Sequence, residues 1–246
     1  MTKPPLLSVE SVGRTFWRGI VEVPVLDGVS FEVNEGEFAA VAGRQASGKT
    51  TLVRIAAGLD APDTGVVRFQ GRDLHAEMRK SRFRGLPPSI GWMSRSGPQI
   101  PSQRMREYVA VPVLEDVSHR AASQRAMRAL DSFGATQLAD AVWSEMSDAQ
   151  RTQAALARAI VREPALLVAD DPTAGLDVHD REILLGLLRR VAETTGMATL
   201  IAVPEIADML RSHKVMTLSD GELMQASRHK PGQVVEFPPR RRPGSA

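Results

Sequence analysis

The chain contains no cysteine among its 246 residues, so disulfide bonds and thiolate metal sites are both excluded. Long hydrophobic runs are also missing. Apolar stretches such as ALLVA (165–169) and ATLIAV (198–203) are far shorter than the roughly 20 residues that span a bilayer. The N-terminal MTKPPLLSVE lacks the long apolar stretch of a signal peptide. We therefore expect a soluble, cytoplasmic chain.

A strong charge of either sign is absent too. The sequence has 31 Lys and Arg against 29 Asp and Glu, a net charge of +2, and its basic residues are scattered rather than arranged in stripes. This balance gives no reason to expect a nucleic-acid partner. A hydrophobic content of 43% is ample for a core, in one domain or in a domain with an added lobe. We find no internal repeat.

Three short runs are almost entirely apolar, namely 38–43, 165–170 and 198–203. Such runs are typical of strands that are buried on both faces of a parallel sheet. Between them, 49–57 and 180–195 read as helices, each followed by a glycine that favours helix termination. The alternation predicts an α/β fold.

The remaining segments suggest additions to this core. A polar helical stretch at 119–133 indicates an inserted lobe, and Asp220-Gly221 predicts a hairpin over 214–227. We expect a basic, disordered tail over 228–246, which has little to bury. Within it, Arg240 to Arg242 are expected to be solvated, with contact to anionic lipid as the alternative.

The motif GRQASGKT (43–50) fits the phosphate-binding pattern G-x-x-x-x-G-K-[ST] and stands between an apolar strand and a helix. Gly43 and Gly48 allow backbone N–H groups to point inward at phosphate oxygens. Lys49 would reach the β- and γ-phosphates, and Thr50 would offer its hydroxyl to Mg²⁺. The alternative is a glycine turn with a chance lysine. The other expected nucleotide-binding residues are Arg44, Gln45, Ala46, Ser47 and Thr51.

The stretch VADDP (168–172) sets two carboxylates at the end of a predicted core strand. Asp170 at the tip of that strand can hold Mg²⁺, directly or through water. Together with the glycine loop it predicts a site for a nucleoside triphosphate and Mg²⁺. These two motifs alone do not choose among GTPases, kinases and ATP-driven machines, although the guanine-reading pattern N-K-x-D does not occur, which disfavours a GTPase.

Two further motifs carry a resemblance. MSDAQ (146–150) precedes the carboxylates, and TAGLD (173–177) follows them. Their order resembles that of the ATP-binding subunits of ABC transporters, and 58–74 and 89–97 look most like the lipoprotein-translocation and macrolide-export group. The resemblance implies a P-loop NTPase core with a mostly parallel sheet, an N-terminal antiparallel β subdomain and an inserted α-helical subdomain at about 95–160. It implies an ATPase domain over 6–227.

In this family an aromatic residue ahead of the phosphate loop stacks on adenine. Phe16 matches that position, and Trp17 is the alternative. Stacking of this kind contributes roughly 1–3 kcal/mol. For either ring, ordinary packing remains the competing interpretation.

Three positions that handle water and the γ-phosphate depart from the family. Asp171 stands where the family has a catalytic Glu and is expected to be a weak base, because it is one methylene shorter. Pro204 stands where the family has a switch histidine, and it has no side-chain donor. Arg95 aligns with the glutamine that senses Mg²⁺, which an arginine cannot coordinate, although Gln99 could substitute or Arg95 could simply be solvated.

The family's signature sequence is altered as well. Ser147 and Gln150 form a capping box, so the start of the helix is expected to survive. Asp148 and Ala149 replace the glycine pair that faces the nucleotide of the opposite subunit. A charge on Asp148 about 4 Å from that phosphate would cost about 4 kcal/mol at an effective dielectric near 20. Asp148 would also favour its own helix dipole.

The resemblance implies partners: a second ATP-binding subunit, as homo- or heterodimer, and an integral membrane permease that holds the chain at the inner face of the membrane. We expect an ATP-binding subunit that hydrolyses ATP weakly or only with its partner. The alternative is a non-hydrolysing, ATP-binding regulatory subunit of a membrane complex. Soluble relatives are disfavoured, because they usually carry paired cassettes or a long coiled-coil insertion.

Overall fold

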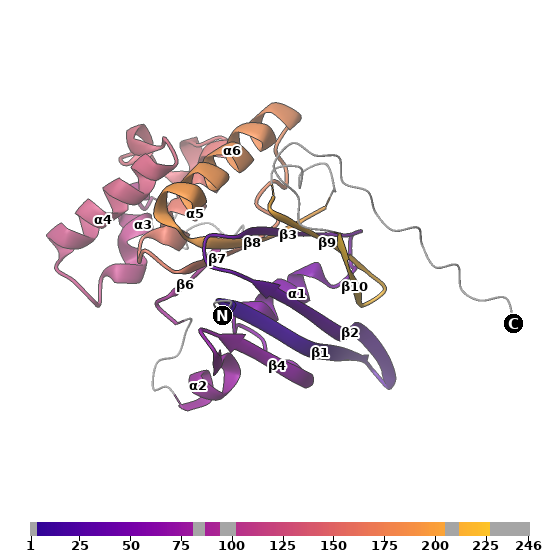
Figure 1. The fold of residues 1–246 in the computed structure, drawn as a ribbon. Helices are drawn as coiled ribbons and strands as arrows, with labels where there is room; N and C mark the ends of the chain where they lie inside the picture. The colour runs from indigo at the N-terminus through magenta and orange to yellow at the C-terminus, as the bar shows by residue number, and fades with distance from the viewer. Residues whose placement is uncertain (1–3, 81–86, 94–101, 205–211, 227–246) are drawn as a thin grey trace, which may run out of the picture.

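The computed structural model describes residues 4–80, 87–93, 102–204 and 212–226. Within them the chain builds two β-sheets, with most of the helices gathered on one side of the larger sheet (Figure 1). The fold confirms the predicted class: a mostly parallel sheet, an antiparallel β part formed from the N-terminal strands, and a group of helices.

The larger sheet has six strands in the order β10-β9-β3-β8-β7-β6. All neighbours pair in parallel except β10 and β9, which form the predicted antiparallel hairpin. Its strands are β3 (Phe38–Ala42), β6 (Ile90–Met93), β7 (Leu166–Asp170), β8 (Ala198–Val203), β9 (Lys214–Ser219) and β10 (Glu222–Ala226). The three apolar runs of the sequence are therefore the central strands β3, β7 and β8.

Both faces of these central strands are buried, which explains why the sequence shows no polar alternation there. Ala40, Leu167 and Ile201 belong to one hydrophobic cluster together with helices α3 to α6. Their neighbours Ala39 and Val168 belong to a second cluster, which includes α1 and the antiparallel sheet. The sheet thus separates two cores.

The smaller sheet is antiparallel, in the order β2-β1-β4-β5. It consists of β1 (Leu7–Arg18), β2 (Val21–Val33), β4 (Thr64–Phe69) and the short β5 (Arg72–Asp73). Its buried residues Val12, Phe31 and Val67 pack into the second core, over α1. This sheet is the N-terminal antiparallel part that the resemblance implied.

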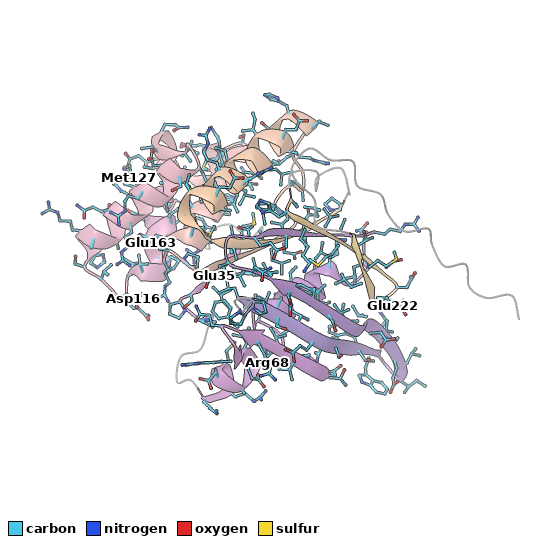
Figure 2. The ribbon with its side chains drawn as sticks, viewed as in Figure 1. Glu35, Arg68, Asp116, Met127, Glu163 and Glu222 are labelled. Carbon is cyan, nitrogen blue, oxygen red and sulfur yellow. The ribbon has the colours of Figure 1, made fainter. Side chains whose placement is uncertain are left out.

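The helices are α1 (Lys49–Ala56), α2 (Leu74–Lys80), α3 (Met105–Ala110), α4 (His119–Ser132), α5 (Asp148–Ile160) and α6 (Val178–Thr195), with short 3-10 turns at Val111–Val113, Thr136–Leu138 and Trp143–Glu145. The helices predicted at 49–57, 119–133 and 180–195 are α1, α4 and α6. Figure 2 shows Asp116 and Met127 on the helical side of the molecule and Arg68 on the antiparallel sheet.

Glycines end the predicted helices as expected. Gly58 has φ 85°, and the N–H of Leu59 reaches back to the carbonyl of Arg54 at 2.8 Å, so α1 closes in a Schellman motif. Gly196 ends α6 with φ 69°. Asp220 and Gly221, at φ 51° and 81°, form the tight turn between β9 and β10. The predicted tail at 228–246 lies outside the described residues, and the domain limits remain predictions.

Candidate nucleotide site

The carboxyl ends of three neighbouring strands bring the predicted site together. Ala42 at the end of β3 is paired with Val203 at the end of β8, and Ala202 is paired with Asp170 at the end of β7. The glycine loop follows β3, the carboxylates close β7, and Pro204 follows β8. This edge of a parallel sheet is where open α/β proteins bind ligands.

The glycine loop fits its surroundings only because two of its residues lack a side chain. Gly48 has φ 97°, and a Cβ there would lie 2.8 Å from the carbonyl oxygen of Val25. A Cβ on Gly43 would meet the Leu218 carbonyl and, at 2.6 Å, the Ser47 Oγ. Ser47 Oγ is buried and has no hydrogen-bond partner among the described residues. The loop is thus a tight cradle, and its buried Ser47 hydroxyl is available to hydrogen-bond a ligand.

Lys49 spans the mouth of this cradle. Its Nζ donates hydrogen bonds to the carbonyl oxygens of Gly43 at 2.7 Å and Arg44 at 2.9 Å. Burial lowers the pKa of Lys49, and the nearby carboxylates of Asp171 and Asp170 partly oppose that shift. The lysine, the loop backbone and both carboxylates therefore form one electrostatic unit.

Thr50 and Asp170 meet as the motif predicts. Thr50 Oγ1 donates a hydrogen bond of 3.1 Å to Asp170 Oδ1, which joins the first turn of α1 to the tip of β7. One hydroxyl and one carboxylate suit Mg²⁺, which usually takes only one or two protein ligands and completes its shell with water and phosphate. The described residues contain no group of three or more His, Asp or Glu that could hold a metal by themselves.

Asp171 occupies an unusual backbone conformation. Its φ is 49°, and its N–H donates a hydrogen bond of 2.9 Å to the carbonyl of Ala202 on β8. Aspartate adopts this left-handed region more readily than most residues, as Asp220 also does in the turn after β9. The cross-strand bond fixes the point from which the short side chain starts.

Pro204 is exposed directly after β8, at the same edge as Asp170 and Asp171. Arg95 and Gln99 lie outside the described residues, as does Glu205. Whether any of them contacts phosphate is therefore still a prediction.

Phe16 and Trp17 lie near the end of β1, opposite Val23 and Glu22 of β2. Both rings are partly exposed, at 42% for Phe16 and 63% for Trp17. The same hairpin approaches the cradle, since Val25 of β2 lies against Gly48. An Arg14 guanidinium lies 4.9 Å from the centre of the Phe16 ring, a contact that the motif alone did not predict. The sequence signal that could have predicted this contact is the spacing of Arg14 and Phe16, because residues two apart on a strand lie on the same face.

The altered signature sits at the start of α5, as expected. Ser147 Oγ accepts from the Gln150 N–H at 3.3 Å, and Gln150 Oε1 accepts from the Ser147 N–H at 2.9 Å, so the capping box is confirmed. Asp148 is paired with Arg151 at 3.2 Å. The capping box and the Asp148–Arg151 pair thus join residues within the first turn of α5.

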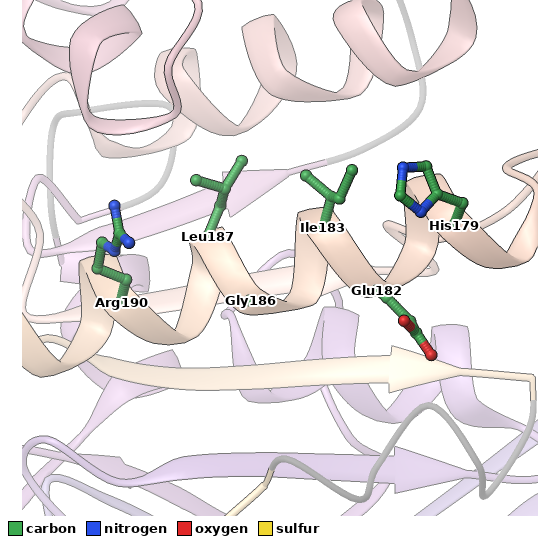
Figure 3. A pocket seen from close by; sticks show the side chains of 6 residues that line it. All are labelled: His179, Glu182, Ile183, Gly186, Leu187 and Arg190. Atoms are coloured by element: carbon green, nitrogen blue, oxygen red, sulfur yellow. The ribbon is translucent and has the colours of Figure 1, made fainter.

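A separate hollow lies along α6 and contains none of the predicted site residues. Figure 3 shows His179, Ile183 and Leu187 on one side of the helix, with Glu182 pointing away from them. The hollow is lined by His179, Glu182, Ile183, Gly186, Leu187 and Arg190. In the described residues, α6 and the other helices are all too short or too polar to cross a membrane.

This arrangement of sheet, glycine loop and strand-end carboxylate defines a P-loop nucleotide-binding domain. The family model described as "ABC transporter" matches residues 26–174. The chain belongs to the ABC transporter family, as an ATP-binding cassette, and members of this family are typically ATPases.

One curated relative is the lipoprotein-releasing system ATP-binding protein LolD of Shewanella denitrificans. It is 30% identical over 226 residues, covering 92% of this chain and 97% of the relative. Among solved structures, the dimeric form of MJ0796, a bacterial ABC transporter cassette, matches with a TM-score of 0.74 at 25% identity, covering 88% of this chain and 96% of that one. A post-hydrolysis dimer of MJ0796 bound to ADP and Pi matches with a TM-score of 0.76 at 25% identity, covering 90% and 98%.

Proposed function

We propose that this chain is the ATP-binding subunit of an ABC transporter complex, that it binds Mg·ATP, and that it hydrolyses ATP weakly or only with its partner. It would pair with a second ATP-binding subunit and couple to a separate membrane permease, which would hold it at the inner face of the cell membrane. The relative in a lipoprotein-releasing system and the dimeric solved cassette support this assignment.

The cradle carries the proposal. Gly43 and Gly48 let the loop pack closely against the Leu218 and Val25 carbonyls, and Lys49 supplies a cation there. In this loop pattern the backbone N–H groups bind phosphate oxygens. Thr50 and Asp170 would hold Mg²⁺, which neutralises charge on the phosphates when it is bound. The MJ0796 dimer bound to ADP and Pi is a relative with the products of ATP hydrolysis in place.

Weak hydrolysis follows from the residues beyond the cradle. Asp171 is one methylene shorter than Glu, and its N–H is tied to the Ala202 carbonyl, so its backbone has little freedom to advance. A misplacement of about 1 Å can cost about 10²-fold in rate. Pro204 offers no donor to a γ-phosphate. ATP binding and ATP hydrolysis would therefore depend on different residues.

Asp148 weakens a partner's site less than its charge alone suggests. The value of about 4 kcal/mol expected from the sequence treats the carboxylate as isolated. In the structure, Arg151 lies 3.2 Å from it, and the Asp148 side chain is 68% exposed, so both pairing and solvent reduce the repulsion. We infer that the altered signature remains compatible with a nucleotide-bridged dimer.

Calorimetric titration of the full chain with Mg·ATP tests the binding half. Lys49→Ala should raise the Kd about 10- to 100-fold, because charge-assisted hydrogen bonds contribute about 1.5–3 kcal/mol each. The matched control is Lys80→Ala, an exposed lysine on α2 that pairs only loosely with Glu77 at 3.5 Å. If the unaltered chain does not bind ATP at millimolar concentration, the proposal is wrong.

Phosphate release tests the hydrolysis half. Asp171→Glu should raise turnover by tenfold or more, since it restores the missing methylene, and Asp171→Glu with Pro204→His should exceed either single change. ATP affinity should stay within about twofold in these variants. Turnover by the unaltered chain at the rate of an ordinary relative would contradict weak hydrolysis.

The departures at Asp171 and Pro204 also favour a second candidate, a non-hydrolysing ATP-binding subunit that regulates a membrane complex. The two candidates differ in the role of Lys49 when the partner ATPase is present. If turnover of the mixture falls with Lys49→Ala, the chain takes part in the motor. If turnover is unchanged although the chain binds ATP tightly, the regulatory role is correct.

A further inference from the structure

Arg14 makes a cation–π contact with Phe16, and this contact involves none of the phosphate-binding residues. Its guanidinium carbon lies 4.9 Å from the centre of the Phe16 ring, over the face of the ring. Arg14 and Phe16 are two residues apart on β1, so their side chains leave the same face of the strand. A cation over an aromatic face attracts the ring and restricts its orientation.

Asp63, in the turn before β4, holds Arg14 in place. Its Oδ1 accepts a 2.6 Å hydrogen bond from Arg14 Nη1, and its Oδ2 accepts a 2.7 Å bond from the Thr15 N–H. The Asp63 N–H in turn donates to the Gly13 carbonyl at 2.9 Å. One residue therefore fixes the backbone of β1 on both sides of Arg14 as well as the arginine itself. Arg14 Nη1 also donates to the Ala61 carbonyl at 3.2 Å.

The same turn is connected to the phosphate cradle through α1. Lys49 begins this helix, and the Schellman motif at Gly58 ends it. Beyond that motif, Asp60 returns to Arg54 of α1 with a bidentate pair of 2.6 and 3.0 Å. Bidentate pairs fix geometry as well as adding energy. A short, fixed segment thus joins the phosphate end of the site to Asp63 and so to Phe16.

We propose that Arg14 is a positioning residue for nucleobase recognition: the Arg14–Asp63 pair covers one face of the Phe16 ring and presents the other face to the base. This inference rests on the proposed ATP binding and adds the residue that orients the ring. It also assigns the stacking role to Phe16 rather than Trp17, since no arginine lies over Trp17 in the described part of the chain.

The test separates base from phosphate. Calorimetry measures binding of Mg·ATP and of Mg·tripolyphosphate, which has the phosphates but no base, to the full chain and to Arg14→Met, Phe16→Ala and the double variant. Arg14→Met should raise the Kd for ATP about twofold to fivefold, the range expected for one cation–π contact, and leave the Kd for tripolyphosphate unchanged. In the Phe16→Ala background, Arg14→Met should have no further effect.

The matched control is Arg68→Met. Arg68 pairs with Glu10 at 3.2 Å in the same antiparallel sheet, so its loss removes a comparable exposed ion pair with no aromatic ring. Arg68→Met should leave both Kd values unchanged, and melting temperatures should show that all variants are folded.

Three outcomes overturn the inference. In the first, Arg14→Met weakens tripolyphosphate as much as ATP, which means a general structural role. In the second, Arg14→Met changes neither Kd, so Arg14 has no role at the base. In the third, the losses for Arg14→Met and Phe16→Ala simply add, so Arg14 does not act through the Phe16 ring. A separate variant, Trp17→Ala, checks the choice of ring: if it weakens ATP binding while Phe16→Ala does not, the assignment to Phe16 is wrong. If neither ligand binds the unaltered chain, the proposed function itself has failed.

Discussion

Replacing Gly48 by alanine should damage both the stability of the chain and its affinity for ATP. Gly48 has φ 97°, in the region that L-residues rarely adopt, and entry into that region costs about 1–2 kcal/mol for alanine. The new Cβ would also lie 2.8 Å from the Val25 carbonyl oxygen and 3.2 Å from Leu26 Cδ2, so β2 or the loop must shift. With the strain of that shift, we expect a loss of about 2–4 kcal/mol.

Thermal unfolding followed by circular dichroism measures this loss. For a chain of this size, about 2–4 kcal/mol corresponds to a fall in Tm of about 5–15 °C. Gly71→Ala is the control, because Gly71 has φ 76° but no described heavy atom lies within 4 Å of the place that its new Cβ would take. It should lose only the conformational part, about 1–2 kcal/mol. Equal losses for the two variants, with ATP affinity intact in both, would refute the reasoning about the close approach of β2.

Other predictions concern single features. Ser147→Ala removes the cap of α5 and should cost about 1 kcal/mol, seen as a lower midpoint in urea. Leu156→Ala empties a fully buried position and should cost about 2–5 kcal/mol in the same assay. Burial lowers the pKa of His75, so the unfolded chain takes up the proton first as the pH falls below about 6.5, and stability should decrease there. His75→Gln, which keeps a donor for the Ile55 carbonyl, should flatten that dependence. Chelation of Mg²⁺ should weaken ATP binding in the unaltered chain.

The core of the fold could be predicted because its sequence signals are local. Buried parallel strands read as apolar runs, and β3, β7 and β8 fall within one residue of 38–43, 165–170 and 198–203. The phosphate loop could be predicted as well, since its glycines and lysine act through backbone angles that the motif encodes. Short helices were harder to predict, because a helix such as α3, with only six residues, is too short to show a hydrophobic periodicity.

What could not be predicted are the contacts that depend on distant segments. The hydrogen bond from the Asp171 N–H to the Ala202 carbonyl joins segments that α6 separates in the sequence, so no local sequence pattern predicts it. The Arg14–Asp63 pair likewise crosses from β1 to the turn before β4. The pairing of Asp148 with Arg151 could have been predicted from the sequence, because residues three apart on a helix are neighbours. Without that pair, Asp148 is treated as an isolated charge.

The order of strands in the large sheet has a consequence for biosynthesis. β3, which leads into the glycine loop, lies between β8 and β9, so its two neighbours come from the last quarter of the chain. A nascent chain that has emerged only through α1 holds the whole phosphate motif, but β3 is the only strand of the large sheet that it contains. Such long-range pairing is slow and leaves apolar edges open in the meantime. The growing polypeptide should therefore not bind nucleotide until translation has passed Ser219. Ribosome-bound fragments that stop before β9 should need chaperones, rather than ATP, to remain soluble.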